Sequence, residues 1–182
     1  MKKILIATIT IILGIYMCII FICADLYIDY NLGKYSVYYA HNMAHKEGTH
    51  PEMAMALENM DVIYKPNKKN IRYREDGGYT ICKNFLDSEQ FSISYNREEG
   101  EHFYGYYDIT YKSYYFNGTF KLTRAYDSSV GDDEIDIKTV DQEALYKDIY
   151  KNFGFIIEAN VNRKPRINLQ RQFNRKYYKR FN

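Results

Sequence analysis

The chain has 182 residues, of which 25 are basic, 23 are acidic and 46% are hydrophobic, with 21 tyrosines, three cysteines and no tryptophan. A disulfide-stabilised mini-protein would need more cysteines, a disordered chain would contain fewer aromatic residues, and a nucleic-acid-binding domain usually carries a net charge well above +2. The composition therefore predicts one domain of ordinary size with room for a membrane segment, and no nucleic-acid partner.

An apolar segment lies at the N-terminus. Residues 4–24 form an uncharged run of 21 residues that follows two lysines. As a helix this run would be about 31 Å long, which is enough to cross the hydrocarbon core of a bilayer. A cleaved signal peptide usually has a shorter apolar region and a small residue at the minus-three position, where a cut after Ala24 would place Ile22. The pattern favours a retained anchor (residues 1–24), and a cleaved, secreted protein is the alternative.

The charges beside the apolar run predict its orientation. Lys2 and Lys3 precede it, whereas Asp25, Asp29 and Lys34 follow it. By the positive-inside rule the N-terminus should stay in the cytoplasm. We therefore expect a single-pass protein of the inner (cytoplasmic) membrane, with residues 25–162 as a periplasmic or extracellular domain and residues 163–182 as a basic tail.

Helices are predicted on both sides of the middle of the chain. Residues 25–46 have a helical pattern with a break at Leu32-Gly33. Residues 51–60 form a helix in which Pro51 suits the first turn, and Thr49 and Glu52 have capping-box spacing. Residues 140–152 form another, which Gly154 would end, and residues 155–161 would then be a short strand.

Turn-forming residues divide the middle of the chain into strands. Residues 70–75 and 79–85 flank Asp76-Gly77-Gly78, and residues 91–95 alternate between polar and apolar. Residues 102–116 and 119–126 flank Asn117-Gly118, a dipeptide typical of two-residue hairpin turns, and residues 127–141 form an acidic loop. The predicted fold class is α+β, with an N-terminal transmembrane helix and then an antiparallel β-meander of about five strands flanked by helices.

The predicted turn at Asn117-Gly118 assigns the two faces of the last hairpin. It would pair Tyr115 with Phe120 and Ser113 with Leu122, and the side-chain period of two then separates core from solvent. The predicted core face carries Phe103, Tyr107, Ile109, Tyr111, Tyr115, Phe120, Leu122 and Tyr126. The predicted solvent face carries Tyr104, Tyr106, Asp108, Thr110, Lys112, Tyr114, Lys121 and Thr123. Because exposed tyrosines are enriched in interfaces, Tyr104, Tyr106 and Tyr114 are candidate binding residues, unless they are there only as good strand formers.

The C-terminal tail carries a strong local charge. Residues 163–182 contain eight basic residues and no acidic one, which leaves 17 basic and 23 acidic residues in the rest of the chain. An apolar residue recurs every fourth position at Leu169, Phe173 and Tyr177, which predicts a helix that packs by a narrow stripe. Arg171, Arg175 and Lys179 would then face outward, toward anionic lipid, a cell-wall polymer or an acidic partner. The alternative is a solvated tail, or one that folds back on the acidic domain.

Three of the four histidines lie close together in the sequence. His41 and His45 are four residues apart on a predicted helix, a spacing that can place two imidazoles on one metal, and His50 follows. The zincin pattern needs Glu directly after the first His, where this chain has Asn42. A polar helix end is therefore the favoured interpretation, and a metal-dependent envelope hydrolase is the alternative.

No motif in the chain specifies a reaction. It has no phosphate-binding glycine loop, no serine elbow and no CxxC pair, and Cys82 has no partner outside the apolar run. We expect a non-catalytic binding module without a cofactor that contacts the membrane through residues 4–24 and another protein through its domain. Toxin immunity, exclusion of phages or plasmids, and assembly of an envelope complex fit equally well. The chain is similar to pilin-like proteins in broad plan, but it lacks their processing site, so no function follows.

Overall fold

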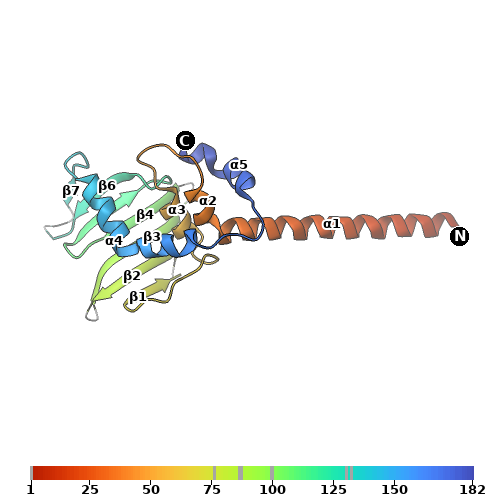
Figure 1. The fold of residues 1–182 in the computed structure, drawn as a ribbon, viewed down its shortest axis with the longest axis horizontal. Coiled ribbons are helices and arrows are strands. Elements are labelled where there is room, and N and C mark those ends of the chain that lie inside the picture. Colours follow the sequence, from red (N-terminus) through yellow and green to blue (C-terminus); the bar gives the residue numbers. More distant parts are fainter. Residues whose placement is uncertain (1, 76, 86–87, 99–100, 130, 132) are drawn as a thin grey trace.

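The computed structural model describes residues 2–75, 77–85, 88–98, 101–129, 131 and 133–182. A long N-terminal helix projects from an α+β domain in which helices pack against one face of a seven-stranded antiparallel sheet (Figure 1). Asp76, the first residue of the predicted turn, lies outside the described residues.

The N-terminal helix α1 (Lys2–Lys34) is longer than the apolar run, with 33 residues and a length of about 50 Å. Within the part of the chain that the structure describes, it is one helix that is long and apolar enough to cross a membrane or to serve as a signal sequence, and none of its apolar window is buried. The predicted break at Leu32-Gly33 is wrong in position, because α1 continues through both residues and the break comes at Tyr35, between α1 and α2 (Ser36–His41). An exposed apolar surface of this extent is typical of a segment that contacts a membrane or a partner, and it is also compatible with a signal sequence.

Helix α3 (Pro51–Glu58) confirms the predicted helix and the place of Pro51 in its first turn. The predicted capping box is wrong, because His50 is the N-cap and makes no side-chain cap. The Thr49 hydroxyl instead donates to the carbonyl of Lys46 at 2.6 Å. Almost every residue of α3 is buried, since the helix lies between the sheet and the other helices (Figure 1).

The sheet is a continuous meander in which each strand pairs with its neighbours in the sequence. The hairpin around Gly77-Gly78 and the alternating strand are confirmed, but the structure has seven strands instead of about five. The predicted strand at 102–116 is two strands, and the acidic loop contains a short edge strand. The strands are β1 (Ile71–Arg74), β2 (Tyr79–Phe85), β3 (Ser88–Glu98), β4 (Glu101–Tyr107), β5 (Lys112–Phe116), β6 (Leu122–Asp127) and β7 (Asp133–Ile135).

Two turns of the same kind join β4 to β5 and β5 to β6. Their sequences, Asp-Ile-Thr-Tyr-Lys at 108–112 and Asn-Gly-Thr-Phe-Lys at 117–121, share an Asx, a Thr, an aromatic residue and a Lys at equal spacing. In each, the Asx Oδ1 accepts from the backbone N–H groups of the Thr and the Lys. The aromatic residue adopts a positive φ, 63° at Tyr111 and 58° at Phe120. These are three-residue loops that end in a left-handed residue.

The three-residue loop overturns the predicted assignment of faces. With loop residues 118–120, Phe116 pairs with Leu122, and a register shift between Tyr115 and Phe116 then pairs Tyr115 with Arg124, not with Phe120. One additional loop residue changes which side chains share a face with Leu122, and so exchanges the two sides of β4 and β5. Tyr104, Tyr106 and Tyr114 are 0%, 1% and 8% exposed, so their predicted exposure is wrong.

Helix α4 (Gln142–Val161) extends beyond its predicted end. Asp141 caps it by accepting from the backbone N–H of Ala144 at 3.0 Å. The predicted stop at Gly154 and the predicted strand at 155–161 are wrong, because the buried stripe continues through Ile156 and Ile157. An interior glycine costs about 1 kcal/mol, whereas burial of each isoleucine contributes about 1.5–3 kcal/mol, so packing outweighs the local stop signal.

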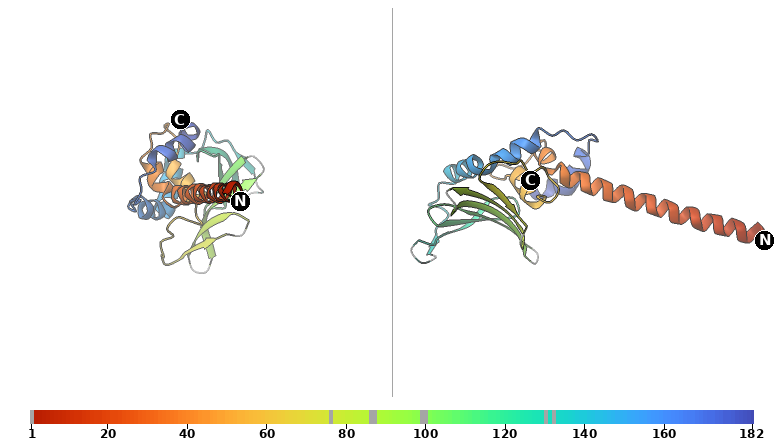
Figure 2. Two further views of the ribbon diagram at one scale, coloured as in Figure 1. Left: turned by 90° about the vertical axis from the view of Figure 1, so that its right-hand side faces the viewer. Right: turned by 90° about the horizontal axis from the view of Figure 1, so that it is seen from below.

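The basic tail forms helix α5 (Gln170–Phe181), as its apolar stripe predicts. Leu169 and Phe173 are buried, Tyr177 is partly buried, and Phe181 continues the same stripe. The Tyr39 hydroxyl donates to the carbonyl of Ile167 at 3.1 Å and accepts from the backbone N–H of Leu169 at 3.2 Å, which fixes the start of α5 on α2. The right-hand view of Figure 2 shows the helices over one face of the sheet only.

Candidate functional site

Tyr104 belongs to a buried polar network that fixes the C-terminal helix. Its hydroxyl donates to the Glu58 carboxylate and accepts from Arg180 Nη2 at 2.7 Å. Arg180 Nη1 lies 3.0 Å from Glu58 Oε2, and Arg180 Nε donates to the carbonyl of Gly118 at 2.6 Å. Burial and the Glu58 charge raise the pKa of Tyr104, so it stays neutral. The network joins α3, β4, the β5–β6 turn and α5, which gives Tyr104 a structural role.

Tyr106 and Tyr114 face α4. The Tyr106 hydroxyl donates to the Asp148 carboxylate and accepts from Asn152 Nδ2 at 3.2 Å. The two tyrosine rings stack at 6.2 Å and line a pocket of about 410 Å³ beside the start of α4. Burial, together with nearby aspartates that include Asp108, raises the pKa of Tyr114 to about 12. The lining carboxylates have structural partners, because Asp108 orders a turn and Asp148 holds Tyr106.

The three neighbouring histidines do not converge. His41 Nδ1 lies 3.3 Å from Glu52 Oε1, and His45 Nδ1 lies 3.2 Å from the carbonyl of Met43. His50 stacks on the Tyr146 ring at 3.9 Å, and burial lowers its pKa. Among the residues that the structure describes, no group of three or more His, Cys, Asp and Glu side chains is placed to hold a metal ion. The geometry on which the hydrolase alternative depended is therefore not found.

The sheet surface that faces away from α2–α5 is the strongest candidate for a binding surface, and we call it the open face. Strand register places two rows of side chains across it, with small residues on β2 and β3, arginines on β1, and the aromatic residues on β4, β5 and β6. One row is Arg74, Thr80, Ser94, Gly105, Tyr115 and Arg124, and the other is Arg72, Cys82, Ser92, Tyr107, Ser113 and Tyr126.

Aromatic rings surround one arginine, Arg124, at the β4–β6 end of the open face. The Arg124 guanidinium lies 5.5 Å from the Phe103 ring and 5.3 Å from the Tyr115 ring, and Tyr115 contacts Tyr126 edge to face at 5.6 Å. Phe103, Tyr107, Tyr115 and Tyr126 are partly exposed, and Arg124 is exposed. Tyrosine, phenylalanine and arginine are the residue types enriched in protein interfaces. The tyrosines available to a partner are thus those that the sequence assigned to the core.

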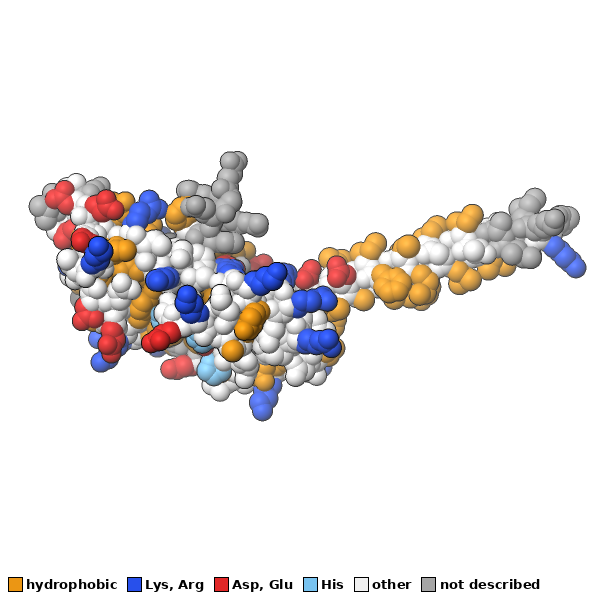
Figure 3. All heavy atoms as spheres, turned by 90° about the horizontal axis from the view of Figure 1, so that it is seen from above, with side chains coloured by type: hydrophobic (Ala, Val, Ile, Leu, Met, Phe, Trp, Pro, Cys, Tyr) orange, Lys and Arg blue, Asp and Glu red, His pale blue; other side chains and the backbone are white. Residues whose placement is uncertain are grey.

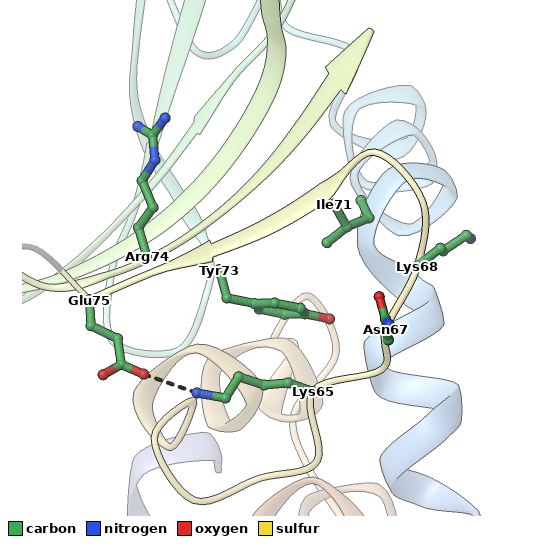
Figure 4. Close-up of a pocket in the computed structure, with 7 residues that line it drawn as sticks. All are labelled: Lys65, Asn67, Lys68, Ile71, Tyr73, Arg74 and Glu75. Carbon is green, nitrogen blue, oxygen red and sulfur yellow. Dashed lines mark hydrogen bonds and ion pairs between the residues drawn. The ribbon is translucent and has the colours of Figure 1, made fainter. Parts of the chain in front are cut away.

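A pocket lies at the edge strand β1, beside the opposite end of the open face (Figure 4). Its volume is about 580 Å³, and Arg74 belongs to both the pocket and the open face. Lys65 Nζ lies 2.9 Å from Glu75 Oε1, and the Tyr73 hydroxyl donates to the carbonyl of Pro66 at 3.0 Å. Figure 4 shows Arg74 on the side of β1 away from Tyr73. Ile71 and Tyr73, which pack against the core, therefore line the pocket from the helix-facing side of β1, opposite to the open face.

The remaining predicted site residues lie on the outer side of α5. Arg171, Arg175 and Lys179 are exposed, as the helical pattern predicts, and Arg171 and Arg175 line a surface pocket. Cys82 is buried, and that burial raises the pKa of its thiol, which agrees with a structural role. No protein-family model matches the chain, and neither a curated protein nor a solved structure is significantly similar to it.

Proposed function

We propose that this protein is a single-pass membrane protein of the cell envelope whose domain binds another protein through the open face and catalyses no reaction. α1 would span the inner membrane with its N-terminus in the cytoplasm, and the domain would face the periplasm or the exterior. The observation that carries the proposal is that the fold leaves two surfaces uncovered, the apolar surface of α1 and the aromatic and arginine surface of the open face.

The charge of the open face indicates the chemistry of the partner. Its described side chains include three basic residues, Arg72, Arg74 and Arg124, and an acidic one, Glu134, at the β7 end. Arg74 and Arg124 are five strands apart, which is about 24 Å at normal strand spacing. Two copies that met through this face would place arginines against arginines. We therefore propose a different protein, with carboxylates beside apolar side chains.

The absence of a catalytic role is proposed from how the polar side chains are used. The groups best suited to acid–base chemistry, Glu58, Tyr104 and Asp148, are bonded to Arg180, Tyr106 and other core residues. Cys82 is buried and its thiol has a raised pKa, so little reactive thiolate forms near pH 7.

Site-specific photocrosslinking of the full chain in its native membrane tests the open face. A photoreactive phenylalanine analogue replaces Tyr115, or Tyr178 as a control on exposed α5. We expect one discrete protein adduct at position 115, and we expect Arg124→Glu to weaken it. The adduct should persist with Lys121→Glu, the control, which changes an exposed cation directly before β6. Equal adducts at both positions, or an adduct unaffected by Arg124→Glu, would refute binding at this face.

The anchor is tested separately by the mass of the protein recovered from the membrane after carbonate extraction. A retained chain that keeps residues 1–24 supports the anchor. A soluble chain that begins after residue 24 would show that the protein is secreted, and the open-face proposal would then apply to a soluble form.

A further inference from the structure

Besides Arg163, which lies over the Tyr64 ring, and Lys176, which pairs with Asp29, five exposed cations lie in the segment before α5 and on α5 itself. They are Lys164, Arg166, Arg171, Arg175 and Lys179, and we call them the basic collar. Within the described structure none of them has an ion-pair partner, and residues 163–182 contain no acidic residue. The adjacent Ile167 is 49% exposed, so an apolar side chain lies among these cations. Unpaired cations beside an exposed apolar side chain are typical of surfaces that meet a membrane interface.

Helix α5 is fixed beside the base of α1. Lys176 Nζ lies 3.3 Å from Asp29 Oδ1, and the rings of Phe173 and Tyr39 lie 5.5 Å apart. Figures 1 and 2 show the segment at 162–169 running alongside α1, toward its N-terminus. Figure 3 shows Lys and Arg side chains around the base of α1, while most acidic side chains visible in that view lie toward the other end of the domain.

The position of Asp29, which pairs with Lys176, indicates how far α5 lies from the bilayer. The apolar run ends at residue 24, so Asp29 follows it by five residues, or about 7.5 Å along the helix axis. The Debye length at physiological ionic strength is about 8 Å. If α1 spans the membrane, Lys176 on α5 therefore lies within about one Debye length of the lipid headgroups, and the segment at 162–169 runs alongside α1 in the direction of the bilayer (Figures 1 and 2). Asp25 opposes this attraction, whereas the charge of Asp29 is compensated by Lys176.

We propose that the basic collar binds the phosphate headgroups of anionic phospholipids in the leaflet from which the domain emerges. This inference rests on the membrane anchor of the proposed function. Lysine supplies a point charge and arginine a planar pair of donors, both suited to phosphate oxygens. Because α1 and the collar contact the membrane at two places, the domain is held at a fixed angle and the open face keeps one orientation.

The chain offers a fluorescence reporter because it has no tryptophan. Ile167→Trp places a single indole within the collar, and the full chain carrying this substitution is reconstituted in phosphatidylcholine vesicles. Two vesicle preparations are compared, and both contain the same small fraction of phosphatidylglycerol. An equal amount of lipid carries a dansyl group in each, and this labelled lipid is phosphatidylglycerol in one preparation and phosphatidylcholine in the other. We expect energy transfer to labelled phosphatidylglycerol to exceed transfer to labelled phosphatidylcholine by about twofold or more at low salt, and the ratio to approach one at high salt.

Two variants of equal charge change separate the collar from general electrostatics. The collar variant is Lys164→Gln, Arg166→Gln and Arg171→Gln. The control is Lys138→Gln, Lys147→Gln and Lys151→Gln, three exposed cations on α4 and the loop before it. We expect the collar variant to bring the transfer ratio close to one and the control to keep the parent ratio. Circular dichroism of both variants verifies that they are folded.

Three results would overturn the proposal: a ratio near one in the parent, an unchanged ratio in the collar variant, or loss of the preference on addition of equimolar soluble polyphosphate. The last result would show that the collar prefers a soluble polyanion. Failure of the anchor is recognised separately, because the protein would then not float with neutral vesicles at high salt.

Discussion

The Arg180 network provides the sharpest test of the structure. Arg180 comes two residues before the end of the chain, yet its guanidinium contacts Glu58 on α3, Tyr104 on β4 and the carbonyl of Gly118. The side chains of Glu58 and Arg180 are 11% and 21% exposed, so water replaces little of what is lost if one partner is removed. Arg180→Ala would leave a largely buried carboxylate without its cation.

The expected loss of stability is about 3 kcal/mol. Removal of one partner from a fully buried ion pair costs about 3–5 kcal/mol, and the partial exposure of Arg180 places this pair at the lower end. For a domain of about 150 residues, each kcal/mol shifts the melting temperature by about 2–4 °C, which predicts a decrease of about 6–12 °C. Arg171→Ala is the control on the same helix, where an exposed, unpaired cation should change stability by less than about 0.5 kcal/mol.

The measurement is urea unfolding of the full chain in mild detergent, followed by the near-ultraviolet circular dichroism of its tyrosines. A double-mutant cycle with Glu58→Gln isolates the pair, and we expect a coupling energy of about 2 kcal/mol. If Arg180→Ala unfolds within about 0.5 kcal/mol of the parent, or if the two substitutions are additive, the network does not hold α5 as described.

Two further predictions concern the turns and the pH dependence of stability. Tyr111→Gly should stabilise the domain by up to about 1 kcal/mol, because it removes strain at φ 63° from an exposed residue. Phe120→Gly should instead cost about 3 kcal/mol or more, because the Phe120 ring is buried. Urea unfolding measures both, and equal effects would contradict the shared turn. Burial lowers the pKa of His50, so its contribution to the free energy of unfolding is present above about pH 6.5 and is lost as the pH falls through the lower folded pKa. Unfolding midpoints from pH 7 to 5 should therefore fall less steeply in His50→Phe than in the parent. Parallel curves would show that His50 does not titrate this way.

Local patterns in the sequence were sufficient to predict most elements. The apolar run predicts α1 by length alone, Pro51 places the start of α3, and the four-residue spacing from Leu169 predicts how α5 packs. These predictions succeed because a helix repeats every 3.6 residues, so its buried side is visible in the order of residues.

The sequence could not determine which side of β4 and β5 is buried. That choice depends on whether the loop after Phe116 has two residues or three, and the Asn117-Gly118 dipeptide is compatible with both. A shared sequence pattern in the two turns is the signal that could have indicated three, because Asp108 and Asn117 precede Thr, an aromatic residue and Lys at the same spacing.

The sequence alone determined an apolar N-terminal helix, an α+β domain and a net charge divided between an acidic body and a basic tail. The tertiary structure decided that Tyr104 is buried against Glu58 and Arg180, that Tyr115 and Arg124 lie on the open face, and that α5 lies beside Asp29 at the base of α1. The physical reason is that burial and charge pairing depend on neighbours far apart in the chain, and a change of one residue in a loop exchanges the two faces of a strand.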